Sequence, residues 1–303
     1  MSHPIPKSIR EYLDQLREEL RGADAAMIQD ALYDAEEHLR AEMAEHPELD
    51  EAAMLARVAT SYGAPDEVAE IYRVKEGEVE QALRPRRARP PVERSLPARF
   101  FGVAVDPRAY AALFYMVLAL ATGIFYFVWV VTGLSMSAGF AILIIGVPFV
   151  ILFFATVRAL SFVEGKIVEA MLGVRMPRRP QAVQREGSIW QRIGAMFTDP
   201  RTWSTLFYML LMLPLGIIYF SIVTIGTSLA IGLIVGPFIH LFSSYGNGIV
   251  MWNDGYVVWS APLWLLPLME IAGVFLLFSM LHIARGIGHL HGQLAKHLLV
   301  KAG

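Results

Sequence analysis

The hydrophobic residues of this chain follow two different patterns along its length. Up to about residue 80 they recur three or four positions apart among charged residues, which predicts short amphipathic helices. From about Tyr110 onward they form long apolar runs, and about 20 such residues cross a bilayer as one helix. The pattern therefore predicts an all-α protein, in which a small helical bundle precedes a polytopic α-helical membrane domain.

Residues 1–80 are predicted to form a bundle of four short helices. Asp24 and Asp50 are residue types that cap helix starts, Gly63 suits a helix stop, and Pro65 fits the first turn of a helix. The apolar positions expected to form the core of this bundle are Tyr12, Leu13, Leu16, Leu20, Ile28, Ala31, Leu32, Ala35, Leu39, Met43, Met54, Leu55, Val58, Tyr62, Val68, Ala69, Ile71 and Tyr72.

The apolar runs predict four membrane spans, over residues 109–131, 138–160, 203–225 and 262–284. The Gly/Ser segments 132–135 and 226–228, which follow the first and third spans, are expected to be turns. A further apolar stretch, 229–243, has only 15 residues, and counting it as a fifth span would place the C-terminus outside. It is therefore predicted to be a re-entrant or partial helix at the outer side.

The membrane domain contains an internal duplication. Residues 99–139 align without a gap with residues 192–232, at an offset of 93, with 18 identities in 41 positions. Aligned Asp-Pro-Arg, Tyr and Gly residues are not explained by shared apolar composition. The chain is thus divided into an acidic domain, a linker, one membrane repeat, and a second repeat with an amphipathic tail: residues 1–80, 81–99, 100–191 and 192–303.

Each repeat opens with an Asp-Pro-Arg sequence. An aspartate at a helix start accepts hydrogen bonds from free backbone N–H groups, proline fits the first turn, and arginine reaches lipid headgroups. Trp residues gather at the opposite side, in a loop over residues 244–260 that carries no Lys or Arg. The membrane-interface anchors are therefore predicted to be Asp106, Arg108, Asp199, Arg201, Trp252 and Trp259.

Charge adds an orientation to this picture. The net charge of −2 combines 8 Lys/Arg and 20 Asp/Glu in residues 1–80 with 18 Lys/Arg and 8 Asp/Glu in residues 81–303. The linker, the segment 158–192 and the C-terminal tail are basic, so by the positive-inside rule all three are expected in the cytoplasm. The prediction is a multi-pass protein of a bacterial inner membrane with both termini cytoplasmic and its basic flanks on anionic headgroups.

Catalytic chemistry is not indicated by any motif in the sequence. The chain has no cysteine, and the helical series His38, Glu42 and His46 is more simply a solvated surface than a metal site. Neither a cofactor nor a metal is predicted. Two ionisable residues in apolar surroundings, His240 and Glu270, are the candidates for a response to a ligand or to pH, because such groups are costly inside a membrane.

A resemblance to a known family appears in the acidic domain. The leucine-rich first helix, Glu36-Glu37-His38-Leu39, and the closing run Tyr62-Gly63-Ala64-Pro65-Asp66-Glu67-Val68-Ala69-Glu70-Ile71-Tyr72 resemble the HAAS-type helical signalling domain over about residues 8–73. Tyr62 stands where that family usually has leucine. The resemblance implies a signalling role with a cytosolic protein partner, such as a PadR-like transcription regulator. Direct binding of nucleic acid is not expected, because the basic linker has neither a folded basic surface nor interleaved aromatic residues.

A second resemblance covers residues 100–300. Pro214-Leu215-Gly216-Ile217-Ile218-Tyr219-Phe220, and Phe162-Val163-Glu164-Gly165 with Met171-Leu172-Gly173, resemble the bacterial membrane "putative sensor" domain. Glu164-Gly165 departs from the usual Glu-Arg. The leading hypothesis is therefore a membrane-embedded sensor, and the alternative is a small transporter or lipid-handling protein, since internal repeats also mark transporters. An intramembrane enzyme is the third and weakest reading, and self-association is left open.

Overall fold

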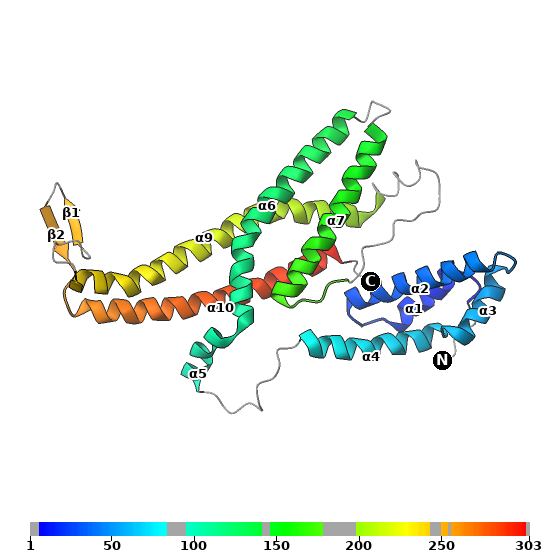
Figure 1. Ribbon diagram of the computed structural model, residues 1–303, viewed down its shortest axis with the longest axis horizontal. Helices are drawn as coiled ribbons and strands as arrows, with labels where there is room; N and C mark the ends of the chain where they lie inside the picture. Colours follow the sequence, from blue (N-terminus) through cyan, green and yellow to red (C-terminus); the bar gives the residue numbers. More distant parts are fainter. Residues whose placement is uncertain are drawn as a thin grey trace. The chain divides into compact units, whose positions relative to one another are not determined.

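The computed structural model describes residues 6–83, 95–140, 146–177, 198–242, 250–253 and 256–300 and confirms the all-α class (Figure 1). Short helices come first: α1 (Ile9–Glu19), α2 (Ala25–Glu45), α3 (Glu51–Ser61), α4 (Pro65–Leu83), α5 (Leu96–Phe101) and the 3-10 turn η1 (Gly102–Val105). The long helices are α6 (Pro107–Phe140), α7 (Gly146–Leu172), α9 (Pro200–Phe242) and α10 (Leu265–Leu299). A short hairpin of β1 (Val250–Asn253) and β2 (Tyr256–Ser260) precedes α10.

The starts of α2, α3 and α4 and the end of α3 lie at the residues that the sequence indicated, whereas α4 continues to Leu83. Asp24 accepts a hydrogen bond from the Ala26 amide at 2.9 Å, and Asp50 accepts one from the Ala53 amide at 2.8 Å. Gly63 has a φ of +112°, a left-handed conformation that favours glycine over other residues at a helix end. Each cap satisfies backbone groups that the helix itself leaves free.

The four helices enclose one hydrophobic core of their own. Buried side chains from all four helices form it, and they are Tyr12, Leu16, Leu20, Met27, Ile28, Ala31, Ala35, Leu39, Met54, Leu55, Val58, Val68 and Ala69. Ile71 was expected in this core but is 50% exposed, because it lies on the outer face of α4 while Tyr72 packs inward. The N-terminal domain therefore has the internal packing of an independent folding unit.

Among the described residues, four helices are long and apolar enough to cross a bilayer: α6, α7, α9 and α10. The predicted turns at 132–135 and 226–228 are wrong, since both lie inside helices, in α6 and α9. Their glycines are contact points instead. A Cβ at Gly133 would come within 2.1 Å of the Phe153 ring, and one at Gly226 within 2.3 Å of Met280 Sδ.

The stretch 229–243 is likewise not a separate re-entrant or partial helix. Its residues up to Phe242 continue α9, which runs unbroken for 43 residues and contains Pro214 and Pro237. The loop expected over 244–260 includes the antiparallel pair β1 and β2, in which Met251 faces Trp259 across the ladder. The strands were not predicted, although β-branched and aromatic residues around Asn253-Asp254-Gly255 are typical of a hairpin.

The described chain forms two compact units. The first unit contains residues 1–88, 133–208 and 292–303, and the second unit contains residues 89–132 and 209–291. The units do not follow the two sequence repeats, because each repeat contributes helix segments to both. The first unit includes the N-terminal domain and all of α7.

Within the second unit, α6 and α9 cross with their backbones in contact. A Cβ on Gly123 would lie 2.5 Å from the Met212 carbonyl oxygen, and a Cβ on Gly216 would lie 2.4 Å from the Ala119 carbonyl oxygen. Gly123 and Ala119 of the first repeat align with Gly216 and Met212 of the second. The crossing is therefore symmetric, and it needs glycine on both helices, as in other close helix pairs in membranes.

Candidate functional sites

A histidine between two tyrosines lies in the interior of the second unit. The Tyr115 hydroxyl is 2.6 Å from His291 Nε2, and the Tyr219 hydroxyl is 3.2 Å from His291 Nδ1. His291 is only 1% exposed. Both ring nitrogens thus have a partner, as a buried imidazole requires, and a neutral ring donates from one nitrogen and accepts at the other.

A carboxyl group occupies the corresponding place in the first unit. The Tyr208 hydroxyl donates to Glu164 Oε1 at 3.1 Å, and Glu164 is completely buried. Tyr208 and Tyr115 are aligned residues of the two repeats. The same tyrosine therefore bonds an acid in one unit and an imidazole in the other.

These bonds also show how the duplication continues beyond its first helix. Aligning α7 with α10 at an offset of 127 places Glu164-Gly165 on His291-Gly292 and Arg158 on Arg285. In both units, the first helix of one repeat bonds the second helix of the other repeat. The offset is larger than 93 because the second repeat has a longer connection, comprising the end of α9, the hairpin and the start of α10.

An ion pair recurs in the same exchanged pattern. Asp106 lies 3.4 Å from Arg285 in the second unit, and Asp199 lies 3.9 Å from Arg158 in the first. Both aspartates also accept a hydrogen bond from the amide of the arginine two residues later, at 3.1 Å and 3.0 Å. Helix capping by the two Asp-Pro-Arg sequences is thereby confirmed, and their role as membrane-interface anchors stays a prediction.

A cluster of ion pairs in the first unit joins the N-terminal domain to the membrane helices. Arg175, just after α7, lies between Asp30 of α2, at 3.7 Å, and Glu76 of α4. The three side chains are only 9%, 9% and 13% exposed. Charges this deeply buried depend on one another, because removing one leaves its partners uncompensated.

Two further basic residues reach the same domain. Lys296, near the end of α10, pairs with Asp24 at the start of α2. Arg201, at the start of α9, donates to Gln29 Oε1 at 2.6 Å and to the Leu299 carbonyl oxygen at 2.9 Å. We call the whole set the docking cluster: Asp24, Gln29, Asp30 and Glu76 of the N-terminal domain, with Arg175, Arg201 and Lys296.

The candidates chosen from the sequence lie elsewhere. His240 in α9 and Glu270 in α10 are both half-buried residues of the second unit, outside the Tyr–His–Tyr set. Trp252 and Trp259 belong to the backbone of β1 and β2, and their side chains lie outside the described part of the structure. Nothing in these placements tests a response of His240 or Glu270 to a ligand or to pH.

His291 and Glu164 were not chosen as candidates. His291 was expected in an amphipathic tail on the headgroups, but α10 continues to Leu299 without a break, and the face carrying His291 and Ala295 is buried. A usable signal was present: a tyrosine kept in both copies of an apolar helix needs a buried partner for its hydroxyl. The partners, Glu164 and His291, lie on α7 and α10, and these two helices align only at the offset of 127.

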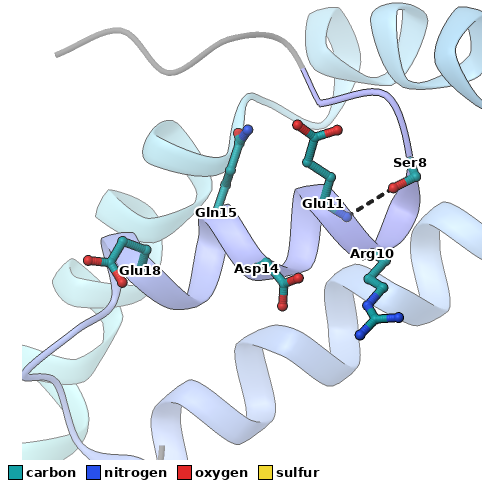
Figure 2. A pocket seen from close by; sticks show the side chains of 6 residues that line it. All are labelled: Ser8, Arg10, Glu11, Asp14, Gln15 and Glu18. Carbon is teal, nitrogen blue, oxygen red and sulfur yellow. Dashed lines mark hydrogen bonds between the residues drawn. The ribbon is translucent and has the colours of Figure 1, made fainter.

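The surface of the N-terminal domain also has a shallow hollow along α1 (Figure 2). The residues that line it are Ser8, Arg10, Glu11, Asp14, Gln15 and Glu18. Apart from the cap Ser8, which accepts the Glu11 amide hydrogen at 3.2 Å, they are side chains of the outer face of α1. The hollow is open and formed by one helix, so it has the character of a solvated acidic face rather than of an enclosed binding site.

Comparison with known proteins gives one match. No curated protein and no solved structure matches the chain. A family model with the description "Putative sensor" matches residues 115–299, which is more than half of the 303 residues. The matched segment begins at Tyr115 and contains α7, α9 and α10, and thus every residue of the two buried tyrosine sets. This multi-pass chain therefore belongs to that family of membrane sensor domains.

Proposed function

We propose that this protein is a non-enzymatic membrane sensor whose N-terminal helical domain reports the packing of the membrane helices to a cytosolic protein. The observation that carries the proposal is the docking cluster. Its basic residues come from the end of α7, the start of α9 and the end of α10, so three membrane helices hold one soluble domain. A cue that shifts one helix end against the others changes the fit of these charges.

Energetics favour a switch between a docked and an undocked state of the N-terminal domain over a gradual change. The N-terminal domain keeps its own core whether docked or not, so undocking breaks ion pairs without unfolding the domain. The Arg175 guanidinium is held by two carboxylates with little access to water, and such an arrangement tolerates little displacement. A small movement of helix ends is thereby converted into release of the domain.

The partner class is proposed from the N-terminal resemblance, which implies a PadR-like transcription regulator. The test is binding of purified PadR-type regulators of the host to the full chain in nanodiscs, with the wild type and with Arg175→Gln. We expect one regulator to bind, with an affinity that differs between the two proteins. If no regulator binds either protein, the signalling proposal fails.

Docking itself is measured by the distance between spin labels. The chain has no cysteine, so Ala44→Cys on α2 and Val163→Cys on α7, both exposed, give one specific label pair within the first unit. We expect a narrow distance distribution that broadens on Arg175→Gln. The exposed Arg57→Gln is the matched control and keeps the narrow distribution.

Transport is the second candidate, and the buried Glu164 and His291 favour it, since ionisable groups deep among membrane helices often mark solute paths. Solute flux or proton uptake by the protein in proteoliposomes, lost on Glu164→Gln, would replace the sensor proposal with a transporter.

A further inference from the structure

The N-terminal domain carries most of the acidic charge of the chain, and one of its faces binds basic side chains that come from outside the domain. Residues 1–80 have 20 Asp/Glu against 8 Lys/Arg. On the α2/α4 face, Asp30 and Glu76 pair with the guanidinium of Arg175. Asp24 pairs with the ammonium group of Lys296. This face is therefore more than a cluster of acidic residues, because its cationic occupants are part of the structure.

The geometry of this face is fixed independently of the membrane helices. Tyr72 of α4 donates a hydrogen bond to Asp34 Oδ2 at 2.7 Å, one helical turn after Asp30 on α2. The bond ties α2 to α4 beside the two carboxylates that hold Arg175. The pair of carboxylates thus keeps its spacing when the domain leaves the membrane helices, and a preorganised site binds with less loss of entropy.

The acidic face of α1 lacks this character. Asp14 and Glu18 are 61% and 50% exposed, and they pair with Arg17 of the same helix and with Arg21 just after it. Ion pairs so open to water contribute little to binding. The two acidic faces thus differ in burial and in the origin of their cations, which makes the α1 face a matched control for the α2/α4 face.

We propose that the α2/α4 face, with Asp24, Gln29, Asp30 and Glu76, is the surface that binds the cytosolic partner, and that Arg175, Arg201 and Lys296 occupy it in the docked state. This inference rests on the proposed function and names the surface and its regulation. The partner is a protein that presents arginine and lysine side chains at a spacing like that of Arg175 and Lys296. Docking and partner binding exclude each other, because both use the same carboxylates.

Two double variants of the full chain separate this mechanism from simple release. Arg175→Gln/Lys296→Gln removes the internal occupants and leaves the acidic face complete. Asp30→Asn/Glu76→Gln also breaks the buried pairs of Arg175, but it removes the carboxylates of the face. The probe is a fluorescent helical peptide with arginines along one face, added to the protein in nanodiscs of zwitterionic phosphatidylcholine, which has no net charge. Its control peptide has citrulline in place of arginine.

We expect the first variant to bind the arginine peptide about tenfold or more tightly than the wild type, because a binding face that is occupied lowers the apparent affinity by its free fraction. The second variant is expected to bind more weakly than the wild type, although the spin-label distances show the domain released in both. Asp14→Asn/Glu18→Gln, on α1, is expected to bind like the wild type. The citrulline peptide is expected to bind none of them.

Four results overturn the proposal. If both double variants bind more tightly, the partner face lies elsewhere on the released domain. If both bind more weakly, the basic residues belong to the partner site, and if neither changes, docking and binding are independent. Equal losses of peptide binding on changing α1 and the α2/α4 face would reduce the effect to net charge.

A double variant whose helical circular dichroism falls is replaced by Arg175→Gln or Asp30→Asn alone, with the same expectations. Regulator binding without these opposite shifts would leave the sensor function standing and this surface assignment refuted.

Discussion

Removing the hydroxyl of Tyr208 is expected to lower the stability of the first unit. In Tyr208→Phe, the buried Glu164 carboxyl loses a hydrogen bond without gaining water. Removing one partner of a buried hydrogen bond costs about 1–3 kcal/mol. We expect a lower thermal unfolding temperature for this variant in nanodiscs. Tyr110→Phe, which removes a hydroxyl from a side chain that is 49% exposed, is expected to change it little, and equal losses would contradict the assignment.

Tyr72 gives the N-terminal domain a dependence on alkaline pH. Burial, and then the hydrogen bond to Asp34, raise the pKa of Tyr72 above its ordinary value of 10.0. Because the pKa is higher in the folded domain, the stabilisation is complete below pH 10 and is lost as the pH rises beyond it. We expect exposed tyrosines to ionise first and the domain to unfold at higher pH, followed by phenolate absorption and circular dichroism. In Tyr72→Phe this dependence becomes shallower, and an unchanged slope would argue against it.

Residues with a local role were the ones that the sequence could identify. Asp24 and Asp50 cap helices, and Gly63 ends one, because capping depends on a few neighbouring backbone atoms. The partners of Tyr115 and Tyr208 could not be found in the same way. Their bonds join residues 176 and 44 positions apart, and only the packing of the helices brings those residues together.

At the scale of the element, the crossing of α6 and α9 is expected to depend on two glycines. In Gly123→Ala or Gly216→Ala, the added Cβ meets a backbone carbonyl at 2.5 Å or 2.4 Å, and backbone cannot turn aside as a side chain can. Overpacking of this kind costs about 1–3 kcal/mol. Thermal unfolding of each variant in nanodiscs measures the loss.

Gly139→Ala and Gly232→Ala provide the controls for this prediction. These two glycines are also aligned in the repeats and lie in the same helices, but an added Cβ meets nothing within 4 Å. Alanine has the higher helix propensity, so we expect stability to be kept or slightly raised. If the two pairs of variants behaved alike, the close crossing would be wrong.

The elements of the N-terminal domain were more predictable than those of the membrane domain. The ends of short amphipathic helices in water are marked by capping residues and charge patterns, and the starts of α2, α3 and α4 lie at such residues. Inside an apolar run, Gly and Ser signal either a turn or a close contact, and Gly133 of α6 and Gly226 of α9 are contacts. For the same reason the end of α9 was mistaken for a separate partial helix.

At the scale of the whole molecule, the members of the docking cluster are expected to contribute unequally. The Arg175 side chain is 9% exposed, whereas those of Lys296 and Asp24 are 22% exposed. Removing one partner of a buried pair costs about 3–5 kcal/mol, whereas a pair near water contributes at most about 1 kcal/mol. Arg175→Gln is therefore expected to undock more of the protein than Lys296→Gln.

The fraction of the broad component in the spin-label distance distribution measures this difference. Raising the salt concentration is expected to undock Arg175→Gln further, since that variant keeps only the more exposed Lys296–Asp24 pair. It is expected to affect Lys296→Gln and the wild type little, since buried pairs are weakly screened. A larger effect of Lys296→Gln than of Arg175→Gln would show that burial does not govern docking. The sequence predicted an acidic domain and basic flanks, but not that the flanks would hold that domain.

The longer connection of the second repeat makes the two repeats of the membrane domain unequal. Each repeat forms an equivalent ion pair and an equivalent tyrosine hydrogen bond with the other, so the aligned parts alone would respond to a disturbance in the same way. In the second copy α9 continues to Phe242 and the hairpin follows, whereas in the first copy α6 ends at Phe140. With 43 residues, α9 is about 64 Å long at 1.5 Å per residue, roughly twice the hydrocarbon thickness of a bilayer. Arg201, which bonds Gln29 of the N-terminal domain, lies in the first turn of this helix, and the segment with the β1–β2 hairpin follows its end in the chain.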